Sequence, residues 1–333
     1  MAHCGVLIRC RGTVHSGFRS FGQLFYSTSG FLLLAAILLV GCATPGTGPD
    51  IDLPPSTPDR VLLTDVPFYA QEKYHCGPAA LAMALQWSGV AVTPEQVADM
   101  VFTPGRKGSF QSDMMAATRR HGRLAYPIKG LHCLIQEVAA GTPVVVLQNL
   151  GLKSIPRWHY ATVIGYDLDQ ASITLHTGDK AGRRVGLKTF MATWTRADQW
   201  GLLVLPVERM PQCAEEVTYL KSVQGLHIAG FADAAITAFQ QAAAVWPASI
   251  QTRMALGNAL YNGGDIQKAI ECYWQAVQIA PRNGDALNNL AHLLAESGDL
   301  NTAVEMAQRA VDAAGPRSPV YRKTLEEIQR RIR

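Results

Sequence analysis

The sequence predicts an α+β domain over residues 61–210, followed by an all-α repeat domain over residues 217–333. Three observations lead to this prediction. The chain of 333 residues is long enough for two ordinary domains. Its middle part mixes helix-start signals with short β-branched runs, which is typical of an α+β fold. Beyond Cys213 the strand pattern stops and a helical pattern with a regular repeat replaces it.

The first 41 residues have the composition of a secretion signal. A basic stretch without acidic residues precedes the apolar run 31–40, which is too short for a comfortable membrane-spanning helix. The run ends in Leu39-Val40-Gly41-Cys42, which resembles a bacterial lipobox, and this implies that Cys42 receives a lipid. An uncleaved membrane anchor is the alternative. Either way we expect an exported, tethered protein, and Ala43 favours the outer membrane, facing the periplasm.

Residues 42–60 are rich in Pro, Gly, Thr and Asp and show no periodicity, so we expect a linker. The formal net charge is +4, and the three arginines of the leader supply three of these charges, which leaves +1 for the remainder. A body so close to neutrality has no strong electrostatic attraction to nucleic acid, and we expect no nucleic-acid partner. The basic run 322–333 is interrupted by glutamates and is typical of a solvated helix face.

The stretch Cys76-Gly77-Pro78 precedes a run of good helix formers that ends near Trp87. Proline is tolerated in the first turn of a helix, so we expect Cys76 at a helix start. The unpaired N–H groups and the helix dipole there favour a thiolate and lower the pKa of a thiol. Upstream, Gln71 offers an amide that could join the Cys76 N–H in an oxyanion hole. The alternative is that Cys76 is only a small buried residue.

A cysteine nucleophile needs a base, and His159 is the best candidate. It stands at the head of an apolar, β-branched strand, 158–167, and its ordinary pKa lies near neutrality. Turn residues then lead to a second strand, 172–176, which predicts an antiparallel hairpin. This hairpin brings the region of Thr177 close to His159. The third member of a catalytic triad stays open between Thr177, His176 and Asp179.

Together, Gln71, the Cys76-Gly77-Pro78-Ala79 helix start and the His159-Tyr160-Ala161 strand resemble the motifs of C39-like cysteine peptidases. This papain-like group includes bacteriocin-processing peptidase domains, and the resemblance runs from about Asp65 to Pro206. It implies a papain-like α+β fold with Cys76 as nucleophile, His159 as base and Gln71 in the oxyanion hole, without a metal or organic cofactor. The family usually closes its triad with an Asp-Pro pair. This chain has Thr177-Gly178 there, as a related set of lipoproteins with helical repeats does.

Other histidines and cysteines give weaker signals. His121 precedes a glycine and is expected to cap a helix. His132 and Cys133 are adjacent, but no second ligand pair with suitable spacing follows, so we expect no zinc site. In an oxidising periplasm a disulfide between Cys133 and Cys213 is conceivable, and the sequence leaves the pairing of these two and Cys272 open.

The C-terminal part repeats every 34 residues. Glycine, alanine and proline recur in register at Gly230, Gly264 and Gly298, at Ala235, Ala269 and Ala303, and at Pro247 and Pro281. This pattern resembles tetratricopeptide repeats, about three of them, which stack into a superhelix that binds peptides or partner proteins. The first unit is the least regular, and it could be a cap on the preceding domain.

The sequence therefore predicts an envelope-anchored cysteine peptidase that cleaves peptide bonds with Cys76 and His159, and whose repeats recruit a substrate or a partner protein. One alternative is a catalytically degenerate, peptide-binding scaffold lipoprotein, which the missing Asp favours. The other is an acyltransferase or amidase that uses the same pair. The cleavage sequence, the true start codon and the oligomeric state stay open.

Overall fold

The computed structural model describes residues 53–313 and 315–332. The predicted signal peptide, the lipidation site Cys42 and most of the linker 42–60 lie outside the described residues. Within the described ranges, no helix is both long enough and apolar enough to cross a membrane.

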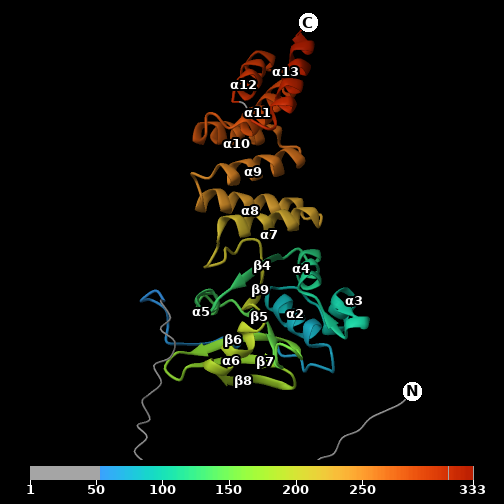
Figure 1. The fold of residues 1–333 in the computed structure, drawn as a ribbon, viewed down its shortest axis with the longest axis vertical. Helices are drawn as coiled ribbons and strands as arrows, with labels where there is room; N and C mark the ends of the chain where they lie inside the picture. The colour runs from blue at the N-terminus through green and yellow to red at the C-terminus, as the bar shows by residue number, and fades with distance from the viewer. Residues whose placement is uncertain (1–52, 314, 333) are drawn as a thin grey trace, which may run out of the picture. The chain divides into compact units, whose positions relative to one another are not determined.

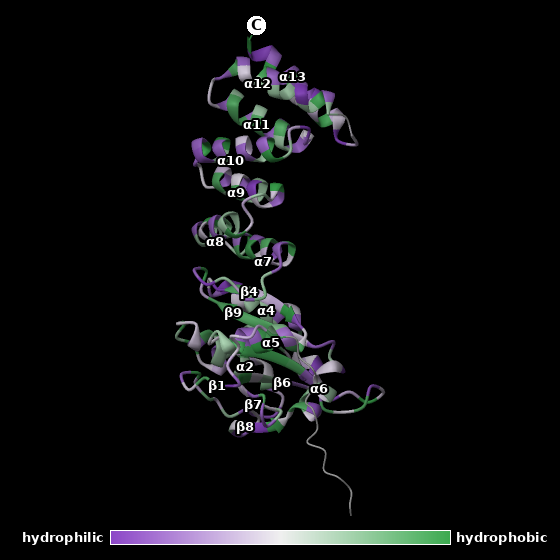
Figure 2. Ribbon diagram, turned by 90° about the vertical axis from the view of Figure 1, so that its left-hand side faces the viewer, coloured by the Kyte–Doolittle hydropathy of each residue, from purple (hydrophilic) through white to green (hydrophobic). Residues whose placement is uncertain are grey.

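A seven-stranded antiparallel sheet forms the centre of the α+β domain, with the order β4-β9-β5-β6-β7-β8 and with β1 paired to β6 (Figure 1). The strands are β1 (Arg60–Leu62), β4 (Leu124–Lys129), β5 (Val144–Asn149), β6 (Trp158–Asp167), β7 (Ser172–Thr177), β8 (Lys180–Gly186) and β9 (Trp200–Leu205). β9 is buried along its whole length, and its residues 202–205 are all strongly hydrophobic (Figure 2). The predicted hairpin of β6 and β7 is confirmed.

Strand β1 has only three residues. It pairs with β6 only from Gly165 to Asp167. The pairing of β5 with β6 reaches Val163, so β5 occupies the remainder of that edge of β6. The chain therefore leaves the sheet after Leu63, whose N–H makes a last bond to the carbonyl of Ile164.

Helices and one small hairpin complete the domain: α2 (Cys76–Trp87), α3 (Pro94–Val101), α4 (Gln111–Arg120), α5 (Leu131–Ala139), α6 (Leu187–Thr195), and strands β2 (Phe102–Thr103) and β3 (Gly108–Ser109) around the 3-10 turn η1 (Pro104–Arg106). Helix α2 packs against β6 and is buried from Gly77 to Leu85. Its residues are apolar on all sides, which suits a helix enclosed by protein. Helix α3 begins with a capping box formed by Thr93 and Gln96, and His121 is the C-cap of α4, as expected.

The repeat region consists of α7 (Glu216–Ile228), α8 (Ala232–Val245), α9 (Ile250–Asn262), α10 (Ile266–Ile279), α11 (Gly284–Glu296), α12 (Leu300–Asp312) and α13 (Ser318–Ile332). The repeating alanines Ala235, Ala269 and Ala303 are fully buried where neighbouring helices pack. The repeating glycines Gly230, Gly264 and Gly298 have φ values of 96°, 84° and 96°. They fill the left-handed position that ends a helix, which favours glycine.

The first repeat helix is joined to the α+β domain by hydrogen bonds and a disulfide. The Tyr126 hydroxyl of β4 accepts a bond of 2.9 Å from the Glu215 N–H and donates one of 3.3 Å to the Cys213 carbonyl. Cys133 of α5 is disulfide-bonded to Cys213, 80 residues further along the chain. Of the cysteine pairings that the sequence left open, the structure therefore has Cys133 with Cys213, and Cys272 is a free, buried thiol.

Glu137 lies beside this disulfide in the interior. It accepts a hydrogen bond of 3.2 Å from the Cys213 N–H. Burial raises the pKa of its carboxyl to about 7, since desolvation disfavours the charged form.

Candidate active site

Cys76 is the first residue of α2 and is half-buried. The adjacent Gly77 is buried so tightly that a Cβ atom there would lie 2.5 Å from the Ser109 hydroxyl oxygen and 3.5 Å from the Tyr160 ring. Pro78 occupies the first turn, where a missing N–H costs nothing. The local sequence thus fixes the start of α2 against β3 and β6, with the thiol beside Tyr160.

The pKa of the Cys76 thiol is raised by burial, and backbone hydrogen bonds at Tyr160, Gly77 and Cys76 itself lower it to a lesser extent. The expectation that the helix start lowers this pKa is therefore wrong in its net direction. The physical reason is that desolvation disfavours the thiolate more than the neighbouring amides stabilise it. The thiol of Cys76 is therefore protonated near neutral pH.

His159 is the second residue of β6, and its Nε2 atom lies 2.7 Å from the Thr177 Oγ1 atom at the end of β7. When the threonine hydroxyl accepts a hydrogen bond from the Nε2–H group, Nδ1 is left with a free lone pair and can act as a base. Burial lowers the pKa of His159, and the positive charge of Arg183 lowers it further. The imidazole is therefore neutral near pH 7.

The other two candidates for the third triad member do not contact His159. His176 is buried, with Nε2 3.2 Å from the Val66 carbonyl and with Nδ1 accepting a bond of 3.0 Å from the Gly182 N–H. Asp179 is exposed and lies 3.6 Å from Lys180. Of the three residues, only Thr177 is in position to orient His159.

Gln71 is held by three hydrogen bonds. Its N–H donates to the Gly178 carbonyl at 2.8 Å, and its Oε1 accepts from the Gly178 N–H at 2.9 Å. Its Nε2 donates to the Tyr160 carbonyl at 3.3 Å. Because Oε1 is fixed at Gly178, the amide nitrogen points toward the Tyr160 carbonyl of β6, and Gln71 lines the same cavity as Cys76.

Gln71, Cys76 and His159 line one cavity of about 830 Å³. Sequence reasoning missed much of the remaining lining, because these residues come from segments with no chemical motif. The additional residues include Glu72, Tyr74, Arg106, Lys107, Ser109, Phe110, Arg157, Arg196 and Asp198. Trp158 also borders the cavity.

Comparison with known families assigns the α+β domain. Residues 63–200 match the Peptidase_C39 like family. Residues 257–298 match a TPR repeat model and residues 284–315 a tetratricopeptide repeat model. Residues 63–200 form a C39-like peptidase domain. No curated protein matches the chain.

Solved structures similar to the chain include proteins with either part of this architecture. A C39-like peptidase from Bacillus anthracis is 20% identical with a TM-score of 0.38, covering 44% of this chain and 97% of its own. The Sgt2 TPR domain from Aspergillus fumigatus is 20% identical with a TM-score of 0.34, covering 38% and 82%. The Yersinia enterocolitica type III secretion chaperone SycD, in complex with a peptide of the translocator YopD, is 15% identical with a TM-score of 0.34, covering 37% and 99%.

In the C39-like domain of this chain, Thr177-Gly178 replaces the Asp-Pro pair that usually closes the family's triad. The two residues act on different partners, because Thr177 bonds His159 while Gly178 bonds Gln71. A proline at position 178 has no N–H to donate to the Gln71 amide. Gly178 also has a φ of 59°, in the left-handed region that favours glycine. The Thr-Gly pair is thus matched to the way this domain holds Gln71.

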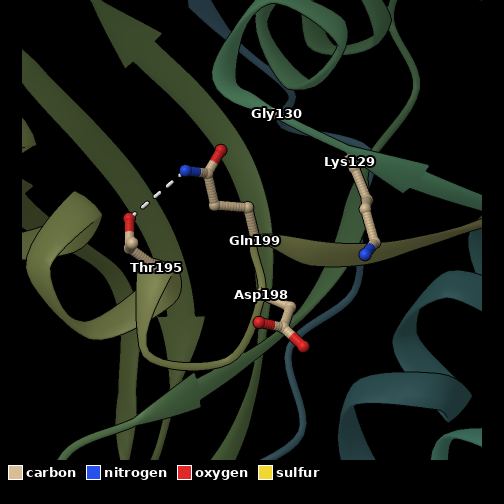
Figure 3. A pocket seen from close by; sticks show the side chains of 5 residues that line it. All are labelled: Lys129, Gly130, Thr195, Asp198 and Gln199. Atoms are coloured by element: carbon tan, nitrogen blue, oxygen red, sulfur yellow. Dashed lines mark hydrogen bonds between the residues drawn. The ribbon is translucent and has the colours of Figure 1, made fainter.

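A second, smaller hollow of about 420 Å³ adjoins the cavity of Cys76 at Asp198, which lines both, and its other lining residues are Lys129, Gly130, Thr195 and Gln199 (Figure 3). The Gln199 amide donates to the Thr195 hydroxyl at 3.3 Å. These five residues include no cysteine and no histidine. The larger cavity is therefore the candidate active site of the C39-like domain, because it holds both a nucleophile and a base.

Within the described ranges, one group of side chains has the spacing of metal ligands, namely Cys133, Glu137 and Cys213. The two sulfur atoms are already joined in the disulfide. A thiolate is the form of cysteine that binds a metal, so this group does not hold one while the bond is intact.

Proposed function

We propose that the C39-like domain is an active cysteine peptidase with Cys76 as its nucleophile. The observation that carries this proposal is the convergence of three elements on one cavity: the start of α2 with Cys76, the β6–β7 hairpin with His159 and Thr177, and Gln71. Each supplies a different part of acyl-transfer chemistry, namely a nucleophile, an oriented base and an oxyanion donor.

The pKa directions determine the order of proton transfer. Burial keeps both the thiol of Cys76 and the imidazole of His159 neutral. His159 therefore takes the thiol proton as the sulfur attacks the peptide carbonyl, and the bond between carbonyl carbon and sulfur forms. The Gln71 Nε2 and the Cys76 N–H stabilise the oxyanion. The C–N bond then breaks, and His159 protonates the leaving amine. Water, deprotonated by His159, hydrolyses the thioester and restores the thiol.

We also propose that the protein acts in the cell envelope. The leader 1–41 would direct export, and a lipid on Cys42 would anchor the protein to the outer membrane, facing the periplasm. The Cys133–Cys213 disulfide supports an oxidising compartment. The tetratricopeptide repeats would bring a peptide or protein substrate, or a partner protein, to the enzyme.

Two other functions would use the same cavity. A peptide-binding scaffold is favoured by Thr177, because its neutral hydroxyl supplies no negative charge to an imidazolium at His159. Acyl transfer or amide hydrolysis would use the same nucleophile and base, with a different acceptor or leaving group.

The test is incubation of the chain from Ala43 onward with a mixed peptide library and identification of new termini by mass spectrometry. We expect cleavage by the wild type and none by Cys76→Ala or His159→Ala, whereas Cys272→Ala should retain activity. Cleavage that persists in Cys76→Ala would rule the proposal out. Products that carry a transferred acyl group instead of a new carboxyl terminus would favour acyl transfer.

A further inference from the structure

The cavity that holds Cys76 is bordered by more positive than negative side chains. The cations are Arg106, Lys107, Arg157 and Arg196, against the acids Glu72 and Asp198. In the described part of the chain, none of the four cations takes part in an ion pair. Their charge is therefore available to a ligand.

The cations come from three separate segments of the domain. Arg106 and Lys107 belong to the turn between β2 and β3. Arg157 lies in the connection from β5 to β6, and Arg196 is the C-cap of α6. The Arg196 Nε donates to the Asn149 carbonyl at 3.1 Å, which fixes the position of this guanidinium.

Exposed aromatic side chains border the same cavity. Tyr74, Phe110 and Trp158 line it and are 43%, 48% and 56% exposed. Large aromatic groups are seldom left so open, and at the rim of a cavity they provide apolar area that a ligand can cover.

The connection that carries Arg157 and Trp158 is ordered by its own hydrogen bonds. The Asn149 Oδ1 accepts bonds of 2.9 Å from both the Gly151 and the Arg157 N–H groups. The Asn149 Nδ2 donates to the Leu152 carbonyl at 3.3 Å. This side of the cavity is therefore organised before a ligand binds, which reduces the entropy lost on binding.

We propose that the cavity selects peptide segments in which acidic residues flank a large apolar or aromatic residue. The acidic side chains would meet the unpaired cations, and the apolar one would cover Tyr74, Phe110 or Trp158. This preference is a substrate specificity only if the domain is the peptidase proposed above, so the inference rests on that proposed function. It also stands as a statement about binding, which can be measured without cleavage.

The test uses the full chain purified in detergent, with Cys76→Ala to prevent turnover. Three matched fluorescent peptides carry glutamate, glutamine or lysine on both sides of a central phenylalanine, and their binding is measured by fluorescence anisotropy. We expect the glutamate peptide to bind about tenfold tighter than the glutamine peptide, as a few exposed charge contacts would give. The preference should shrink as salt is raised, because exposed charges are screened.

A charge-reversal variant tests the residues. Arg106→Glu combined with Lys107→Glu should remove the preference for the glutamate peptide and improve binding of the lysine peptide. The matched control reverses two exposed lysines that do not line the cavity, Lys188→Glu with Lys221→Glu, and should keep the wild-type preference.

Equal binding of the three peptides would overturn the inference, even if the wild type cleaves all of them and the proposed function holds. A preference for the glutamate peptide without cleavage by the wild type would support the inference and count against the peptidase. Binding to vesicles of anionic phospholipid tests whether the four cations contact lipid headgroups instead of acidic peptides. If the charge reversal weakens vesicle binding and leaves peptide binding unchanged, the inference is wrong.

Discussion

At the scale of single residues, the imidazole of His159, the proposed base, is oriented by a hydroxyl. The bond between Thr177 and His159 fixes the ring and one of its nitrogens. A carboxylate in the same place would also stabilise a positively charged imidazole. The lowered pKa of His159 agrees with the absence of that stabilisation, because burial and Arg183 act on it unopposed.

Replacement of Thr177 by valine removes the hydroxyl and keeps the shape of the side chain. We expect kcat to fall by about 10- to 100-fold, since a base that is no longer oriented transfers protons poorly. KM should change little, because Thr177 is not among the residues that line the cavity. Thr177→Ser keeps the hydroxyl and should retain most of the activity. Equal kcat values for the valine variant and the wild type would remove Thr177 from the mechanism.

The pH dependence of activity follows from the two neutral groups. His159 must be unprotonated to act, and its pKa lies below the ordinary value of 6.5, so the acidic limb of kcat/KM should lie below pH 6.5. The pKa of Cys76 is raised above 9.0, so we expect a plateau that extends past pH 9. A pH–rate profile checks both limbs. Alkylation of Cys76 by iodoacetamide should likewise rise only at alkaline pH, and rapid alkylation at pH 5 would contradict the neutral pair.

At the scale of elements, the start of α2 is fixed by its contact with strand β3. A Cβ atom at position 77 would lie 2.5 Å from the Ser109 hydroxyl oxygen, so a side chain there is not easily accommodated. The nucleophile next to Gly77 therefore depends on the small hairpin of β2 and β3 for its position.

Gly77→Ala should destabilise the protein by about 1–3 kcal/mol, the usual cost of overpacking, and reduce kcat by displacing Cys76. The added Cβ meets both the Oγ and the Cβ of Ser109, at 2.5 and 2.8 Å. Ser109→Gly removes both atoms, so the double variant should recover much of the lost stability and activity. Urea unfolding and kcat are measured for the wild type, both single variants and the double variant, which gives the coupling between the two substitutions. Additive effects would show that the contact does not position Cys76.

The sequence predicts the elements whose signals are local. Pro78 and the following helix formers indicate the start of α2, and turn residues between two β-branched runs indicate the β6–β7 hairpin. Strand β8 was missed because Lys180–Gly186 is polar, exposed and contains little β-branched character. The end of β1 has no local signal. It is set by β5, which is distant in sequence and pairs with the neighbouring part of β6.

The same distinction holds for the candidate site. Cys76, His159, Gln71 and Thr177 could be named from motifs and from hairpin geometry. The direction of the Cys76 pKa could not, because burial is a property of the folded chain. The charge of the cavity could not be predicted either, since Arg106, Lys107, Arg157 and Arg196 come from three segments with no shared pattern.

At the scale of the whole molecule, the Cys133–Cys213 disulfide stabilises the junction between the C39-like domain and the repeats. It closes a long loop, with 80 residues between its ends. The bond therefore restricts the unfolded chain considerably, which favours the folded state.

Replacing both cysteines by serine should lower the free energy of unfolding by about 2–4 kcal/mol. Urea unfolding of the wild type with and without reductant, compared with the double variant, measures this effect. We expect reductant to shift the wild type toward the variant and to leave the variant unchanged. An equal shift in both proteins would show that the effect of the reductant does not come from this bond.

The disulfide also decides what happens when the backbone is cut. The exposed connection between β5 and β6, with Leu152 and Ile155 at its surface, lies inside the loop that the disulfide closes. A break there places Cys76 on one fragment and His159 on the other. Cys133 stays with the first fragment and Cys213 with the second, so the two pieces remain covalently linked. A clipped molecule thus keeps its nucleophile and its base in one particle, and only reduction frees the halves to separate.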